Sequence, residues 1–279
     1  MNWINCSISA VDPLKKDQRV IYLLKKEIKT ILYNKKTYLL FVFFLAIMLL
    51  DLWINYTNNI LIGENVNWEN VFSPPFMSFL SGKSEGHFGA MLFSWCMPLY
   101  MLVCISDSYT TEYKLNYHTI LATRCGRKKE YFSKLKASFI MGFSMTFLAL
   151  LVNHLLAIML FHQGMRIDIY MHNTLNALSL SQPEISYIIY MLIAAIIFGL
   201  CAMYCSALSF CLRDVKFLYA VSYFIWLFVI ALPYSIMHCI QPFIEYGFSY
   251  VVPAFIIYAA IVAACCYLGY RRKVIKDDL

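Results

Sequence analysis

The sequence Ser81-Gly82-Lys83-Ser84 is typical of the end of a phosphate-binding loop, which in other proteins holds the phosphates of ATP. The full motif requires a further glycine five positions before Gly82, and that position is Met77. A phosphate-binding loop also follows a strand, and no strand is predicted before these residues. We therefore expect that the chain does not hydrolyse ATP by itself and that it is not an enzyme.

Polar side chains inside apolar runs are the second group that could do chemistry. Asp51, Asn153 and His154 stand in such runs, where an ionisable group is costly and tends to face a cavity. Hydrolysis there would need a nucleophile beside a base, or a cluster of metal ligands, and the sequence has no HExxH, GxSxG or CxxC motif. We expect no metal site, and we expect these three residues to line a substrate path. The alternative is that they are hydrogen-bonded packing residues.

The interval from Asp107 to Lys136 is the longest polar stretch between two apolar runs. It holds seven Lys or Arg residues and three acids. Its own apolar core, Tyr117–Leu121, is too short to cross a membrane. We interpret the interval as a helix on the membrane surface to which a partner protein binds. A basic patch for lipid headgroups would explain the charge alone.

The elements that position these residues are predicted to be membrane-spanning helices. The chain is 61% hydrophobic and 14% charged, with a mean hydropathy of +0.63, outside the range of soluble domains. Each of six apolar runs has about the 20 residues that a helix needs to cross ~30 Å of hydrocarbon. The predicted spans are Tyr38–Tyr56, Phe88–Ser106, Ala137–Phe161, Ile188–Leu212, Phe217–Ile240 and Tyr250–Tyr270. We expect an all-α polytopic membrane protein in which Pro98, Pro233 and Pro253 kink their helices.

Lys and Arg are distributed unequally between the two sides of these spans. One side carries 21 of them, and the other carries only Lys83 and Arg166. The positive-inside rule then predicts that both termini lie in the cytoplasm. The chain divides into a cytoplasmic amphipathic helix in residues 1–37, a transmembrane domain in residues 38–270 and a cytoplasmic tail in residues 271–279.

The N-terminal part shows helical periodicity from Leu14 to Lys36. Its apolar arc is Ile21, Leu24, Ile28, Ile31 and Leu32, and Lys25, Lys26 and Lys29 lie on the opposite side. That pattern is typical of a helix in the membrane interface, with lysines toward anionic headgroups. The helix could transmit force from a partner or could serve only as an anchor.

A run of residues around the basic interval resembles a known family. The residues that carry the resemblance are Glu112, the sequence Thr119-Ile120-Leu121, Arg124, Arg127 and Lys134. They resemble the membrane subunit of ATP-binding-cassette transporters of the type-2 exporter permease family. Members of that family commonly have an acidic residue after the second span, then a short coupling helix, and basic residues at the start of the third span. Leu24–Phe41 resembles that family's N-terminal connecting helix and first span. The family's frequent Gly-Thr pair is Asn116-Tyr117 here.

The resemblance implies a complex. Two permease subunits, identical or related, would enclose a path, and two separate ATPase chains would bind ATP and Mg²⁺ below them, so this chain would hold no cofactor. Residues about 113–123 would form a cytoplasmic coupling helix between the second and third spans. The residues implied in ATPase contact are Glu112, Tyr117, Thr119, Ile120, Leu121, Arg124, Arg127 and Lys134. Membrane lipids are further partners, and no nucleic acid is expected.

We therefore expect the permease subunit of an exporter in the plasma membrane of a bacterium. Its spans are rich in Phe, Tyr and Met, which suits an amphipathic or hydrophobic cargo such as a peptide, an antibiotic or a lipid. The alternative is a non-transporting membrane assembly or sensor subunit that recruits a cytosolic partner through its basic face. An intramembrane enzyme is the third and least favoured hypothesis, because it would need the catalytic motifs that are absent.

Overall fold

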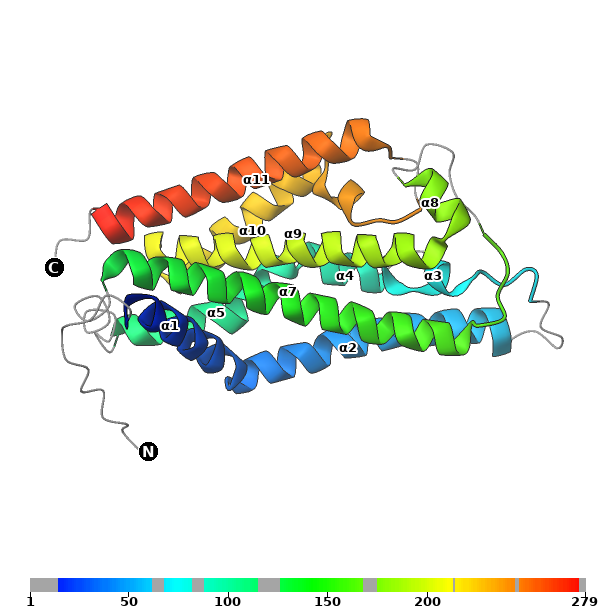
Figure 1. Cartoon of the computed structure of the whole chain (residues 1–279), viewed down its shortest axis with the longest axis horizontal. Helices are drawn as coiled ribbons and strands as arrows, with labels where there is room; N and C mark the ends of the chain where they lie inside the picture. The colour runs from blue at the N-terminus through cyan, green and yellow to red at the C-terminus, as the bar shows by residue number, and fades with distance from the viewer. Residues whose placement is uncertain are drawn as a thin grey trace.

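The structure is a bundle of long helices, which lie along one common direction (Figure 1). It is a computed structural model, and it describes residues 15–61, 68–81, 88–114, 126–167, 175–212, 214–243 and 246–275. Within these ranges no strand forms, and the only strand-like pairing is an isolated bridge between Phe72 and Arg166. The prediction of an all-helical protein is confirmed for the described residues.

Four helices are long and apolar enough to cross a membrane, as counted over the described ranges. They are α2 (Lys35–Tyr56) with its continuation η1 (Thr57–Leu61), α7 (Arg127–Leu160), α9 (Pro183–Cys211), and α11 (Phe248–Tyr270) with its continuation η4 (Arg271–Ile275). They correspond to the predicted first, third, fourth and sixth spans. α7 and α9 each begin before the predicted span and end one residue before its predicted end.

The predicted second span is broken into two helices. α4 (Phe88–Trp95) and α5 (Met97–Lys114) meet at an angle of 49°, and together they pass as a fifth candidate span. Pro98 is the second residue of α5, where a proline needs no backbone partner for its missing N–H group. The kink expected at this proline is therefore confirmed as a break.

The predicted fifth span is shorter than expected. α10 (Val215–Ala231) has 17 residues, whereas the sequence suggested a helix as far as Ile240. Leu232 turns into an extended conformation, and Pro233, which follows it, cannot donate a helical hydrogen bond. The chain continues as the short helix η3 (Ile236–Cys239) before α11 begins. Pro233 therefore lies beyond the end of the helix that it was expected to kink.

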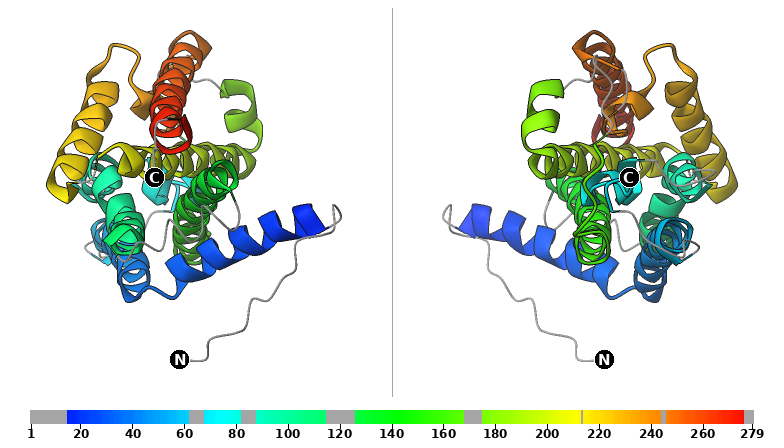
Figure 2. Two further views of the ribbon diagram at one scale, coloured as in Figure 1. Left: turned by 90° about the vertical axis from the view of Figure 1, so that its left-hand side faces the viewer. Right: turned by 90° about the vertical axis from the view of Figure 1, so that its right-hand side faces the viewer.

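α7 and α9 lie side by side at the centre of the bundle (Figures 1 and 2). α9 also contacts α5 and α11, and 61% of its most apolar stretch is buried, compared with 22% for α11. Glycines allow the close approach, because a Cβ atom on Gly142 of α7 would lie 2.7 Å from the Cβ of Ala202 of α9. On the other side of the interface, Gly199 of α9 faces the ring and backbone of Phe139.

The first helix lies apart from this direction. α1 (Lys15–Leu32) ends before Asn34, whose side chain caps the start of α2, so the predicted single segment to Lys36 is two helices. Figure 2 shows α1 crossing one end of the bundle and projecting beyond it. We call this end the basic end, because α1, the first turns of α7 and η4 bring their lysines and arginines to it. α3 (Pro74–Met77), η2 (Phe79–Ser81) and α8 (Asn176–Ser181) lie toward the opposite end.

Candidate functional site

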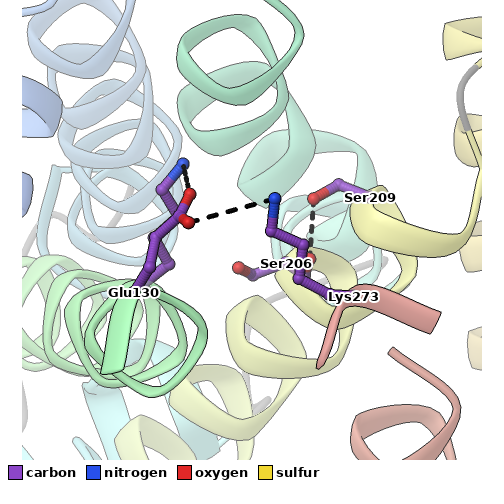
Figure 3. Close-up of polar contacts among 5 residues, drawn as sticks. Glu130, Ser206, Ser209 and Lys273 are labelled. Atoms are coloured by element: carbon purple, nitrogen blue, oxygen red, sulfur yellow. Dashed lines mark hydrogen bonds and ion pairs between the residues drawn. The ribbon is translucent and has the colours of Figure 1, made fainter. Parts of the chain in front are cut away.

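A buried group of charges, Glu130, Lys134 and Lys273, ties α7 to η4 at the basic end. Lys134 follows Glu130 by one helical turn on α7, and its Nζ lies 3.5 Å from Glu130 Oε1. Lys273 comes from η4, and its Nζ lies 3.9 Å from Glu130 Oε2 (Figure 3). All three side chains are buried, with 1% of Glu130 exposed. We call these three residues the inner charged cluster.

The neighbourhood of this cluster is held by further contacts between α7, α9 and α11. The Tyr131 hydroxyl donates to the carbonyl of Cys266 over 2.6 Å, which joins the second turn of α7 to α11. Across from Glu130, Ser209 of α9 donates to the carbonyl of Ser206 over 2.6 Å (Figure 3). Lys134 also lies 5.9 Å from the centre of the Phe210 ring. The start of α7 is therefore fixed to the C-terminal helix through polar and aromatic contacts.

The residues expected to contact an ATPase are only partly described. Tyr117, Thr119, Ile120, Leu121 and Arg124 lie outside the described residues. Glu112 lies in α5, near its end, and Arg127 is the first residue of α7 and is half-buried. Lys134 lies inside the bundle, so any effect of this side chain on a partner passes through the inner charged cluster.

The amphipathic helix α1 packs against α7 by one stripe and leaves another free. Leu23, Glu27 and Ile31, four residues apart, are buried. Of the predicted apolar arc, Ile21 and Leu32 are more than half exposed, and Leu24 and Ile28 are half-buried. Lys25 and Lys29 are exposed, and the Lys29 ammonium lies 5.4 Å from the Tyr33 ring. The helix therefore has one stripe for the bundle and a second apolar arc available to a membrane surface.

A second polar group lies toward the opposite end and includes residues predicted to line a substrate path. The Asn153 side chain accepts a hydrogen bond from the backbone N–H of Phe79 and donates one to the carbonyl of Met48, each over 3.0 Å. His154 Nδ1 lies 2.9 Å from Ser78 Oγ, and its Nε2 lies 3.0 Å from Glu184 Oε2. We call Ser78, Asn153, His154, Glu184 and Tyr187 the outer polar cluster.

This cluster holds the segment Pro74–Ser81 between α2, α7 and α9. The Tyr187 hydroxyl accepts the backbone N–H of Leu80 over 3.3 Å, and the Tyr187 ring lies 4.5 Å from that of His154. Asp51 of α2 is buried beside it, close enough to Gly89 that a Cβ there would lie 3.5 Å from its carboxylate. Three distant parts of the chain therefore converge on one inserted segment.

Ser78, His154 and Glu184 have the residue types of a hydrolytic triad, but their environment favours a structural role. Ser78 is 2% exposed, and its hydroxyl also donates to the carbonyl of Pro74 over 2.8 Å. A nucleophile has to reach a substrate atom, and this hydroxyl is enclosed by its own segment. Across the described part of the chain, no group of three His, Cys, Asp or Glu side chains is placed to hold a metal ion.

Several of these residues were not found from the sequence. Ser78, Glu184 and Tyr187 are separated from His154 by 76, 30 and 33 positions, and no local motif connects them. From the sequence, Glu130 is one of the three acids of the basic interval, and Lys273 is one residue of the predicted cytoplasmic tail, so neither is identified as part of a buried ion pair. The spacing of Glu130 and Lys134 by four residues is the one signal that could have indicated a pair.

Comparison with known proteins identifies a relative. The chain is 33% identical over 235 residues to the uncharacterized protein YybM of Bacillus subtilis (strain 168), a match that covers 82% of this chain and 90% of YybM. No family model matches the chain, and no solved structure matches it.

Proposed function

This chain belongs to the family of the Bacillus subtilis protein YybM, and we propose that it is the transmembrane subunit of an ATP-driven exporter. The observation that carries the proposal is the position of the inner charged cluster. α7 begins inside the basic interval, at Arg127, and Glu130 in its first turn is joined to Lys273 of the C-terminal helix. A partner that moves the basic interval would therefore move both α7 and α11.

The proposed topology has six spans, with both termini in the cytoplasm. The four long helices and the bent pair α4–α5 supply five, and α10 with the following segment supplies the other. The excess of 21 Lys and Arg residues on one side against two on the other supports this orientation, in the plasma membrane of a bacterium. α1 would then lie at the cytoplasmic surface, with Ile21 and Leu32 toward lipid and Lys25 and Lys29 toward anionic headgroups.

The energy source would be a separate ATPase subunit that binds ATP and Mg²⁺, because Met77 replaces the first glycine of the only loop that resembles a phosphate-binding motif. Residues about 113–123 would protrude as the coupling helix, with Arg124 and Arg127 fixing it by charge-assisted hydrogen bonds. α1 would provide a second contact, since it packs against α7. A second permease subunit would complete a path for an amphipathic or hydrophobic cargo.

The test is a purified complex. The chain is isolated in mild detergent, and the co-purifying proteins are identified by mass spectrometry. We expect an ATPase with an intact phosphate-binding loop. The double variant Arg124→Glu, Arg127→Glu should lose most of the stimulated ATP hydrolysis, while Arg271→Glu, an exposed charge at the same end, should keep it.

Two results would contradict the proposal. An unchanged complex and rate in the double variant would remove the coupling assignment. A co-purifying cytosolic protein without any ATPase motif would favour the non-transporting assembly or sensor subunit instead.

A further inference from the structure

The early end of α10 leaves backbone acceptors without partners. Pro233 has no N–H group to donate to the carbonyl of Val229. In the described part of the chain, no backbone N–H donates to the carbonyls of Ile230 and Ala231. A helix of 17 residues is about 26 Å long, shorter than the ~30 Å hydrocarbon core. Figure 1 shows α10 ending well before the far end of α9. The negative end of the α10 dipole therefore lies part-way along the length of the bundle.

A pocket of about 700 Å³ lies against this helix end. Met91 and Trp95 of α4 line one side, and Ile230 and Leu232 line the α10 side. Residues of the segment between α10 and α11, with Tyr250 of α11, complete it. Its volume is within the usual range for small-molecule sites, roughly 300–1,000 Å³. The pocket is thus large enough for a compact organic molecule.

Aromatic rings form much of its wall. His238 stacks on Tyr246 with ring centres 3.7 Å apart, and Tyr250 lies 5.6 Å from Tyr246. Trp95 contributes a further large ring from α4. Among the described residues that line the pocket, none is Lys, Arg, Asp or Glu, and His238 is the one lining group that can carry a charge. Ring faces carry partial negative charge, as do the carbonyls of a helix C-terminus.

We propose that this pocket binds a lipophilic organic cation. The apolar walls accept its hydrocarbon groups, and the ring faces together with the α10 carbonyls stabilise its positive charge. Broken helices in membranes place their C-terminal carbonyls at cations in the same way. As a cargo site this inference rests on the proposed export function, but as a binding site it does not, because binding requires neither an ATPase nor nucleotide.

The test uses tetraphenylphosphonium and tetraphenylborate, which have nearly the same shape and opposite charge. Binding of each to the purified full chain in lipid nanodiscs is measured, and partition into empty nanodiscs is subtracted. We expect the cation to bind at least tenfold more tightly than the anion. Equal or weaker binding of the cation by the unmodified chain would overturn the proposal without any variant.

Variants then locate the site. Trp95→Leu and Tyr246→Leu should each weaken binding of the cation by at least fivefold. Trp53→Leu is the matched control, since Trp53 is exposed on α2 and does not line the pocket, and it should bind as the unmodified chain does. Unchanged binding in both pocket variants would overturn the assignment. Failure of the ATPase experiment with intact cation binding would leave this inference standing and remove only the export function.

Discussion

At the scale of single residues, the inner charged cluster has the largest energetic consequence. Glu130 lies between two ammonium groups in an environment from which water is largely excluded. Removing one partner of a buried ion pair leaves an uncompensated charge, which costs far more than an exposed pair contributes. A neutral group at this position is therefore poorly tolerated.

We expect Glu130→Gln to lower the free energy of unfolding by roughly 3–5 kcal/mol, because the ion pairs of Glu130 with Lys134 and Lys273 are lost. The measurement is unfolding by SDS titration in mixed micelles. Glu184→Gln is the control, since Glu184 is 44% exposed and its loss should cost about 1 kcal/mol or less. Equal losses of unfolding free energy in the two variants would show that the inner charged cluster is not buried as described.

Asn153 permits a more local prediction. Its side chain holds the backbone N–H of Phe79 and the carbonyl of Met48. In Asn153→Leu the Phe79 N–H loses its partner and the Met48 carbonyl keeps only its helical hydrogen bond, and a buried unsatisfied group costs about 1–3 kcal/mol. Hydrogen exchange at the Phe79 amide should become at least tenfold faster, while amides of the α11 helix remain as protected as before. Unchanged exchange at Phe79 would contradict the proposed anchoring of this segment.

At the scale of elements, the central pair of helices depends on small residues. Lipid gives no hydrophobic drive between helices, so close backbone approach and packing must supply the stability. Gly142 and Gly199 provide that approach between α7 and α9. Both glycines are far from turns and have no role as helix ends.

Alanine at Gly142 should therefore destabilise the bundle, although alanine usually favours a helix. Its Cβ would lie 3.1 Å from the carbonyl oxygen of Phe198, besides its contact with Ala202. We expect a loss of roughly 1–3 kcal/mol in SDS titration. Gly89→Ala is the matched control, because its nearest atoms lie at an ordinary 3.5 Å, and it should be neutral or slightly stabilising. A larger loss of stability in Gly89→Ala than in Gly142→Ala would show that α7 and α9 are packed less closely than described.

The sequence predicted these elements unevenly, for physical reasons. Long apolar runs and the break near Pro98 follow from composition and from the missing N–H of proline, and both were found. The end of α10 was missed because the residues after Pro233 remain apolar, and hydropathy does not distinguish a helix from a packed irregular segment. The insertion of Pro74–Ser81 was missed because its partners, Asn153 and Tyr187, lie far away in sequence.

At the scale of the whole molecule, the uneven charge distribution gives a testable orientation. The chain is expected to place Lys29 and Arg271 in the cytoplasm and the exposed Gln163 outside. Single cysteines at these positions, in a cysteine-free background, are treated with a membrane-impermeant maleimide on intact cells. Only Gln163→Cys should be labelled before lysis, and all three should be labelled after it. Labelling at Lys29→Cys before lysis would reverse the topology.

The placement of α1 has a consequence for the order of events at the ribosome. Its stripe of Leu23, Glu27 and Ile31 is completed by α7, which begins 95 residues after Leu32. At 5–20 residues per second, α1 waits roughly 5–20 s for the helix that receives it. During that interval the exposed apolar side chains of α1, Ile21 and Leu32, can lie against the bilayer. α1 therefore has to remain on the lipid surface until α7 has been synthesised.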